Sequence, residues 1–267
     1  MKKIIALVLF FATLSFATDK MVPTYLIGEY ENVPSVLGKL KNNGFKIISM
    51  YQIPEGGMNI LFSDDALINE AKKKNRGFIE VLRAYVDDKY KELRITNPVY
   101  FGKAFMQKEY DDGVFTKEKK KIMGAFKNLK GSKDALKSGD LAGYHFMFGM
   151  PYYEDSITVA KGDANTLLNK VKNYNGGSSY IFDIKLSDNS YIVGFNLDKK
   201  VSEFPKKIGM KNALVLPYLV LLEDGKAKIL SAKYYLAISY PKLSLGQFMK
   251  ISSTPGEIED NIKKAFK

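Results

Sequence analysis

The stretch that decides the fold is SITVAKGDANTLLNKVKNYNGGSSYIFDIKLSDNSYIVGFNL, residues 156–197. It begins with an alternating run typical of a half-buried strand, and a pattern follows in which apolar residues recur three and four positions apart, as in a helix. Asp163 stands where the helix N-cap is expected, and Gly176 and Gly177 stand where the helix should end. Two further alternating runs, separated by Ser-Asp-Asn at residues 187–189, predict a hairpin. The predicted order is strand, helix, strand, strand.

The chain after this stretch is predicted to add two strands and a final helix. Residues 214–230, LVLPYLVLLEDGKAKIL, hold two apolar runs on either side of a Glu-Asp-Gly turn. The last helix is expected to begin near Thr254 and Pro255, because proline is favoured in the first turn of a helix, and to continue to Phe266.

The first half of the chain shows the same signals. Residues 25–53 predict a strand, a helix that ends at Gly44, and a strand, and residues 78–96 predict a hairpin around an Asp-Asp turn. Residues 144–155, YHFMFGMPYYED, share an apolar run, a Pro-Tyr pair and an acidic pair with residues 214–224. We therefore expect residues 144–155 to form the first-half counterpart of that second-half strand.

These units predict an α+β protein of two tandem ferredoxin-like modules, with antiparallel sheets and helices packed on one face. The first module would span residues 18–155, with a basic helical insertion at about residues 107–140, and the second would span residues 156–267. A chain of this length with 46% hydrophobic residues can bury a core without disulfides, and it has no cysteine.

Three segments resemble the domain-of-unknown-function family numbered 302: LKNNGFKI at residues 40–47, ITNPVYFGKAF at 95–105 and VLLEDGKAKI at 220–229. The resemblance implies a small ferredoxin-like sandwich of helices on a sheet, present as two divergent copies, and it implies no settled activity. Members of that family often carry a cysteine after the proline of the Leu-Pro strand, whereas this chain has Tyr152 and Tyr218. A sulfur-based role of the family therefore does not transfer to this chain.

The amino terminus predicts export. Lys2 and Lys3 precede an apolar run at residues 4–12, and Ser-Phe-Ala follows at residues 15–17, which together are the parts of a secretory signal peptide. The run is shorter than the roughly 20 residues needed to cross a bilayer. We expect removal of residues 1–17 and release into the periplasm without a lipid anchor, because no cysteine stands at the cleavage point.

The net charge of +12 is concentrated in one segment, residues 117–137, where eight lysines stand against Glu118 and Asp134. Apolar residues at helical spacing predict an amphipathic basic helix that begins near Thr116 and ends at Gly131. Its lysines are expected to form either a solvated face or a docking surface for an anionic membrane or an acidic partner; nucleic acid is not an expected partner of an exported chain. The candidate docking residues are Lys117, Lys119, Lys120, Lys121, Lys127 and Lys130.

The only histidine of the chain lies in residues 141–155, LAGYHFMFGMPYYED. His145, Met147 and Met150 form an H-x-M-x-x-M pattern, and imidazole with thioether sulfur suits Cu(I). On a strand, however, Met150 would point away from the other two, and methionine often fills gaps in a core. We expect a core strand, with a ligand cleft or a copper site as alternatives. The candidate ligand-binding residues are His145, Met147, Met150, Tyr152 and Tyr218.

Catalytic chemistry has little support in the residues. Without cysteine and with one histidine, the chain cannot form a thiolate nucleophile, an iron–sulfur cluster or a multi-histidine zinc site. Its Asp-Asp pairs are typical of turns and caps, and we expect no catalytic residue, no cofactor and no resident metal. The sequence favours an exported, non-catalytic binding or accessory protein of an unknown protein or small-molecule ligand. A periplasmic copper(I)-binding protein and a hydrolase that uses the His145 region remain the alternatives.

Overall fold

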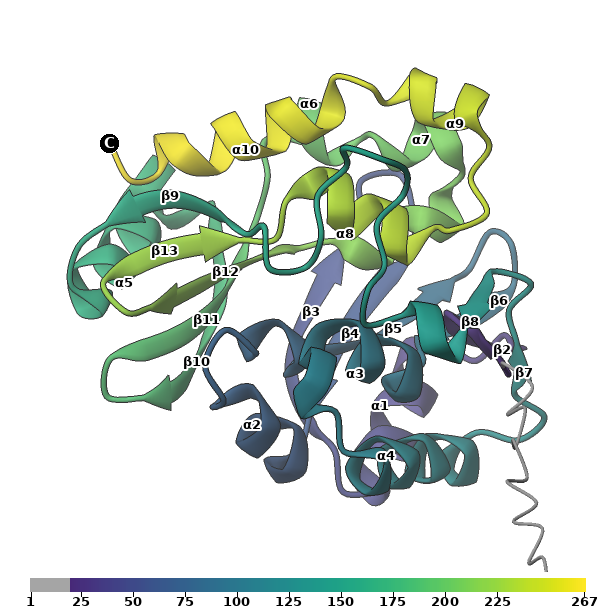
Figure 1. The fold of residues 1–267 in the computed structure, drawn as a ribbon. Helices are drawn as coiled ribbons and strands as arrows, with labels where there is room; N and C mark the ends of the chain where they lie inside the picture. The colour runs from purple at the N-terminus through teal and green to yellow at the C-terminus, as the bar shows by residue number, and fades with distance from the viewer. Residues whose placement is uncertain (1–19) are drawn as a thin grey trace, which may run out of the picture.

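The structure is a computed structural model that describes residues 20–267 (Figure 1). The signal peptide predicted at residues 1–17 lies outside the described residues. The described chain is a mixture of helices and antiparallel sheets, so the fold class is α+β, as predicted, and it is compatible with ferredoxin-like modules.

The first sheet has six antiparallel strands in the order β3-β4-β5-β6-β2-β7. Its strands are β2 (Tyr25–Glu29), β3 (Lys46–Gln52), β4 (Met58–Ser63), β5 (Leu82–Asp87), β6 (Glu92–Thr96) and β7 (Lys130–Gly131). Helix α1 (Val33–Asn42) connects β2 to β3. The Asn32 side chain caps this helix by accepting a hydrogen bond from the Ser35 N–H, and Val36 and Leu40 are buried in the core.

The second sheet has five antiparallel strands in the order β10-β11-β12-β13-β9. Its strands are β9 (Ile157–Lys161), β10 (Tyr180–Ser187), β11 (Ser190–Phe195), β12 (Tyr218–Glu223) and β13 (Lys226–Ile229). Helix α5 (Ala164–Asn173) follows β9 and packs across β10 to β13. As predicted, the Asp163 side chain caps α5, accepting hydrogen bonds from the N–H groups of Asn165 and Thr166.

Both sheets follow the same order of connections when the two-residue strand β7 is set aside. In each, a first strand leads through a helix to four successive antiparallel strands, and the last of these pairs with the first strand. By this order β5 is the counterpart of β12, and each of the two is followed by a turn and a partner strand, β6 and β13 respectively.

Residues 144–155 are not the counterpart of β12, so the prediction of a strand there is wrong. Residues 141–156 form turns and irregular backbone. Gly149 adopts a φ of +78°, and the Met150 N–H donates to the Met147 carbonyl oxygen at 3.0 Å. A strand requires a partner along its edge, and this stretch instead turns back on itself.

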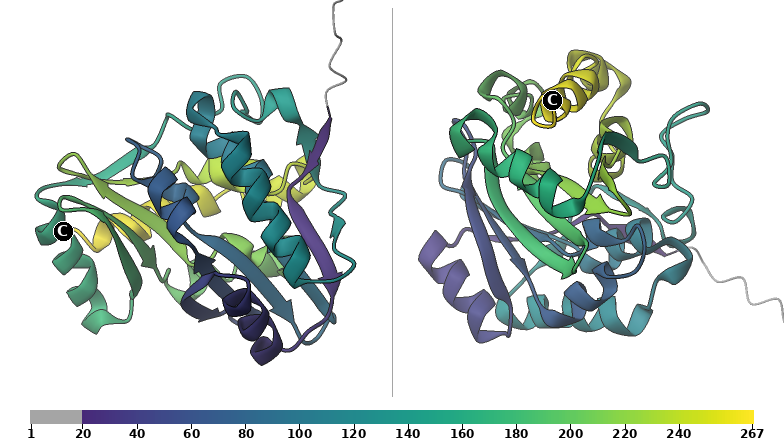
Figure 2. Two further views of the ribbon diagram at one scale, coloured as in Figure 1. Left: turned by 90° about the horizontal axis from the view of Figure 1, so that it is seen from below. Right: turned by 90° about the vertical axis from the view of Figure 1, so that its left-hand side faces the viewer.

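The remaining helices pack around the sheets, with α8 almost entirely buried, and β1 pairs with β8 in a separate ribbon. Helices α1 and α4 lie side by side, and α3 packs on α4 (Figure 2). Helix α10 packs on α8 and β9. These elements are α2 (Asp65–Ala71), α3 (Pro98–Met106), α4 (Asp112–Ala125), α6 (Lys199–Ser202), α7 (Pro205–Ile208), α8 (Ala232–Ser239), α9 (Leu245–Lys250), α10 (Thr254–Lys264), β1 (Met21–Pro23) and β8 (Ala135–Lys137).

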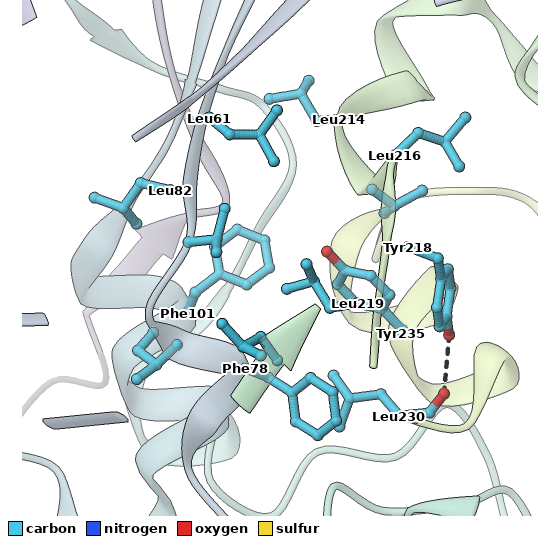
Figure 3. Packing of buried hydrophobic residues seen from close by; sticks show 14 of the residues in the cluster. Leu61, Phe78, Leu82, Phe101, Leu214, Leu216, Tyr218, Leu219, Leu230 and Tyr235 are labelled. Carbon is cyan, nitrogen blue, oxygen red and sulfur yellow. Dashed lines mark hydrogen bonds between the residues drawn. The ribbon is translucent and has the colours of Figure 1, made fainter. Parts of the chain in front are cut away.

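Each half of the chain packs a short helical connection against the sheet of the other half. The 3₁₀ helix η1 (Gly77–Ile79) comes from the first half and contacts β11 and β12, while η5 (Met210–Val215) comes from the second half and contacts β5. The Asn59 side-chain amide of β4 donates to the carbonyl oxygens of Ala213 and Leu216, at 2.9 and 2.8 Å. Apolar side chains of both halves meet in one continuous core (Figure 3). Each half therefore places a short helical segment against the sheet of the other.

Candidate docking loop and apolar groove

Residues 141–155, called the junction loop below, connect the first half of the chain to the second and are held at both ends. At one end Leu141 is fully buried, and the Tyr144 hydroxyl donates to the Ala237 carbonyl oxygen of α8 at 3.3 Å. At the other end the buried Tyr153 ring packs against the rings of Phe105 and Tyr234, with centroids 5.5 and 6.0 Å apart. The segment between these two anchors is consequently held in place at both of its ends.

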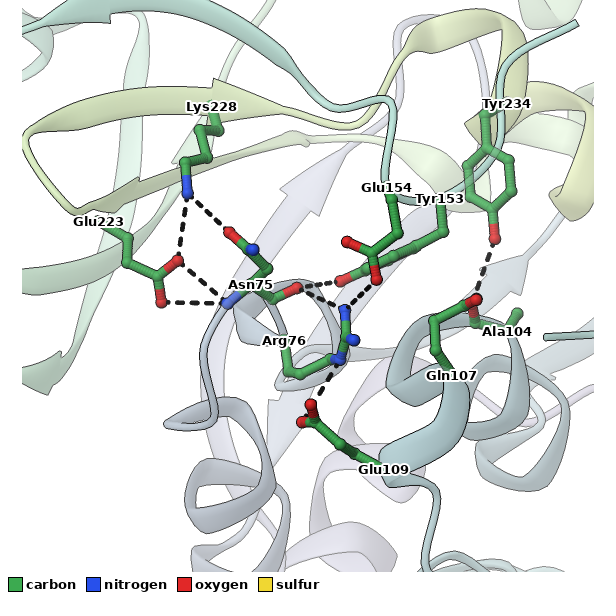
Figure 4. A network of polar contacts seen from close by, with 10 residues as sticks. All are labelled: Asn75, Arg76, Ala104, Gln107, Glu109, Tyr153, Glu154, Glu223, Lys228 and Tyr234. Carbon is green, nitrogen blue, oxygen red and sulfur yellow. Dashed lines mark hydrogen bonds and ion pairs between the residues drawn. The ribbon is translucent and has the colours of Figure 1, made fainter. Parts of the chain in front are cut away.

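A buried arginine strengthens the second anchor (Figure 4). The Arg76 guanidinium lies 5.3 Å from the centroid of the Tyr153 ring, and its Nη1 lies 2.9 Å from Glu154 Oε1. Its Nε lies 3.5 Å from Glu109 Oε2. The Tyr153 hydroxyl donates to the Asn75 carbonyl oxygen at 2.6 Å, and burial raises the pKa of this hydroxyl, which keeps it a neutral donor. Two carboxylates thus compensate the buried charge and tie the junction loop to the first half.

The same network reaches the second sheet. Asn75, which adopts a φ of +59°, donates its N–H to Glu223 Oε2 at 3.0 Å. Its side-chain oxygen accepts from Lys228 Nζ at 2.6 Å. Glu223 ends β12 and Lys228 lies on β13. The polar contacts therefore fix the junction loop relative to both sheets.

Between its anchors the junction loop exposes large apolar side chains. Phe148 is fully exposed and Met147 is 48% exposed. The His145 ring packs on the Tyr152 ring with centroids 4.5 Å apart, and His145 Nδ1 lies 3.5 Å from the Gly143 carbonyl oxygen. Solvent-exposed aromatic and thioether groups on an anchored loop are a typical feature of docking surfaces.

The junction loop and α9 enclose an apolar groove of about 170 Å³. In Figure 1 the loop runs in front of α8 and beside α9. The Phe146 ring of the loop packs on the Phe248 ring of α9, with centroids 4.6 Å apart. The apolar side chains that shape the groove include Phe146, Met147, Met150, Leu236, Phe248 and Met249, and the charged Lys233 also lines it. Thioether chains adapt to ligands of different shape, so this groove suits an apolar group.

Helix α9 was missed in the sequence, although a signal is present. Ser244 and Gln247 form a capping box at its start. Leu245, Phe248 and Met249 follow at spacings of three and four, and Lys242 and Lys250 flank them. Leu245 and Met249 are each 64% exposed. A helix of six residues gives too short a pattern to stand out from a loop.

The structure places four of the five candidate ligand-binding residues in the junction loop as two pairs, and the fifth lies in the core. Met147 and Met150 line the groove, and His145 packs on Tyr152 at the loop tip. Tyr218 lies instead in the core on β12, where it is 1% exposed and donates to the Leu230 carbonyl oxygen at 2.9 Å. Its assignment to a binding site is therefore wrong, because every residue of this central strand is buried.

The basic helix is present but begins and ends about five residues earlier in the chain than predicted. Helix α4 begins after the Asp111 cap, not at Thr116, and ends before Phe126. Lys127 follows the helix and Lys130 lies in β7. The exposed candidates are Lys117, Lys120, Lys127 and Lys130.

Lys121 is not free for docking. It forms ion pairs with Glu118, at 2.9 Å, and with Asp64, and Lys119 is half-buried. Burial, with the Asp64 carboxyl beside it, raises the pKa of Glu118 to about 7. Burial opposes ionisation of Asp64 too, but hydrogen bonds with Glu118 and Lys121 outweigh it and lower the pKa of Asp64. This buried cluster attaches α4 to the cap of α2, where Asp64 accepts from the Leu67 N–H.

Comparison of the chain with family models, with curated proteins and with solved structures finds no match. Among residues 20–267, no three His, Cys, Asp or Glu side chains are grouped so that they could hold a metal ion. In the same part of the chain, no helix has both the length and the apolar character to cross a bilayer.

Proposed function

We propose that this chain is an exported, non-catalytic binding protein that takes up an apolar group of its partner in the groove between the junction loop and α9. The observation that carries the proposal is the combination of an apolar, methionine-lined groove with a loop held at both ends. An anchored loop loses little conformational entropy when a partner binds, so more of the burial energy becomes affinity.

Two placements support a binding role over a hydrolase that uses the His145 region. The His145 ring packs on Tyr152, and its Nδ1 faces a backbone carbonyl oxygen. The carboxyl pair Asp64 and Glu118 is buried beneath α4 and engaged by Lys121. Acid–base catalysis requires its groups to meet at one substrate. Export through residues 1–17, a periplasmic location and the resemblance to the domain-of-unknown-function family numbered 302 are part of the same proposal.

Binding of the apolar dye Nile red tests the groove. We expect its fluorescence to rise with the wild-type protein. Met150→Gln with Met249→Gln should weaken binding about thirtyfold, because the two changes together remove roughly 2 kcal/mol of apolar contact. Met123→Gln is the matched control, since Met123 is 47% exposed on α4, far from the groove lining. Equal dye affinity in all three proteins would contradict the proposal.

Copper(I) binding is the second candidate, because three thioethers, those of Met147, Met150 and Met249, line one groove. The strand geometry that would point Met150 away from Met147 does not exist here. Met147→Leu separates the candidates, since leucine keeps the apolar surface and removes the sulfur. If the groove is a copper site, Met147→Leu should lower the Cu(I) affinity measured by competition with a Cu(I) chelator. If it is an apolar site, the variant should keep the wild-type affinity for Nile red.

A further inference from the structure

We propose that the partner of the groove is a bilayer containing anionic lipid, and that the loop tip and α9 enter its interface. This inference rests on the proposed function and names the partner of the same site. The proposed contact has two parts, an apolar tip for the acyl boundary and lysines for the lipid headgroups.

The apolar part consists of four exposed side chains: Met147, Phe148, Leu245 and Met249. Met147 and Met249 line the groove from its two sides. Phe148 follows Met147 in the loop, and Leu245 lies one helical turn before Met249 on α9. Exposure of large apolar side chains to water costs free energy. Insertion of these side chains into the boundary between headgroups and acyl chains removes that cost.

The charged part is complementary to anionic headgroups. Lys242 precedes α9, Lys250 is its last residue, and Lys233 lines the groove. All three are exposed. Residues 241–256 and residues 141–153 contain no Asp or Glu. Each lysine near an anionic surface contributes about 1 kcal/mol, or roughly a fivefold gain in affinity. An apolar segment of another protein would use the same tip but would not require the lysines.

The basic helix α4 lacks the apolar half of this arrangement. Its exposed Lys117 and Lys120 are accompanied by one exposed large apolar side chain, Met123. A surface with charge alone binds lipid weakly and loses the contact in salt. The tip and α9 are therefore favoured over α4 as the membrane-facing surface.

Vesicle co-sedimentation tests the proposal. The protein used is residues 18–267, which holds every helix and strand of the described structure, because the apolar run at residues 4–12 would itself bind lipid. We expect it to pellet with phosphatidylcholine vesicles that contain phosphatidylglycerol, and less with phosphatidylcholine alone. Lys242→Gln with Lys250→Gln should weaken low-salt binding more than tenfold, while Lys117→Gln with Lys120→Gln, which removes the same charge from α4, should leave it unchanged.

A tryptophan reporter locates the contact, since the chain has no tryptophan. Phe148→Trp should give blue-shifted emission with the anionic vesicles, and Met123→Trp on α4 should not. The proposal is overturned if the wild-type protein stays in solution, if the α4 lysine pair has the larger effect, or if only Met123→Trp shifts. Failure here together with intact Nile red binding would remove the bilayer as partner and leave the proposed function standing.

Discussion

Glu80 is a carboxyl that the fold buries without compensation. It is fully buried, and neither of its carboxylate oxygens finds a hydrogen-bond partner among the described residues. Burial raises its pKa to about 8, against an ordinary value of 4.5. The unfolded chain therefore releases this proton at lower pH than the folded chain does. The contribution of Glu80 to the free energy of unfolding is therefore fully present below about pH 4.5 and is lost as the pH rises toward 8.

Replacing Glu80 by glutamine should flatten this pH dependence. Each unit of pKa difference corresponds to about 1.4 kcal/mol, so the wild-type protein should lose a few kcal/mol of unfolding free energy between mildly acid and mildly alkaline pH. Glu80→Gln should retain only the smaller losses due to Glu118 and Glu259, whose pKa values burial raises in the same direction. Urea unfolding at the two pH values measures the difference, and parallel losses in both proteins would contradict the assignment to Glu80.

At the scale of the element, α4 depends on Lys121 more than on its exposed lysines. Lys121→Met leaves Asp64 and Glu118 as two neighbouring buried carboxyls without a cation. We expect a loss of about 3 kcal/mol in unfolding free energy, larger above pH 7, where Glu118 ionises. Lys120→Met, one position earlier and exposed, should stay within about 0.5 kcal/mol of wild type. Thermal unfolding that ranks the two variants equally would refute this attachment of α4.

The elements differ in how well the sequence predicts them. The cap Asp163, helix α5 and the hairpins at β5–β6, β10–β11 and β12–β13 were predictable because their signals are local. Residues 144–155 were mistaken for a strand because a Pro-Tyr pair followed by acidic residues also suits a turn, and pairing partners are set by distant contacts. In the candidate site, Met147 and Met150 were predictable, whereas α9 and the burial of Tyr218 depend on packing that no local pattern encodes.

At the scale of the whole molecule, the exchanged connections make the two halves depend on one another. Asn59 on β4 is buried and donates to Ala213 and Leu216 of the second half. Asn59→Leu should cost roughly 1–3 kcal/mol, because the buried Leu216 carbonyl oxygen loses its side-chain donor, while the Ala213 carbonyl oxygen still accepts from the Leu216 N–H. Asn69→Leu, on the exposed face of α2, serves as the control.

Unfolding of the Asn59→Leu variant should remain a single transition by both circular dichroism and tyrosine fluorescence, since one core spans both halves. Two separate transitions would mean that the halves fold independently, contrary to the shared core.

The junction loop also has a mechanical consequence. It begins at the buried Leu141, and Tyr144 binds α8 by a hydrogen bond. Tyr153 then packs against Arg76 of the first half, before the second half begins at β9. Any load applied at its tip is thus divided between the two ends and transmitted to both sheets together. When the tip of the loop is bound to a partner, both sheets should therefore move with it as one rigid unit.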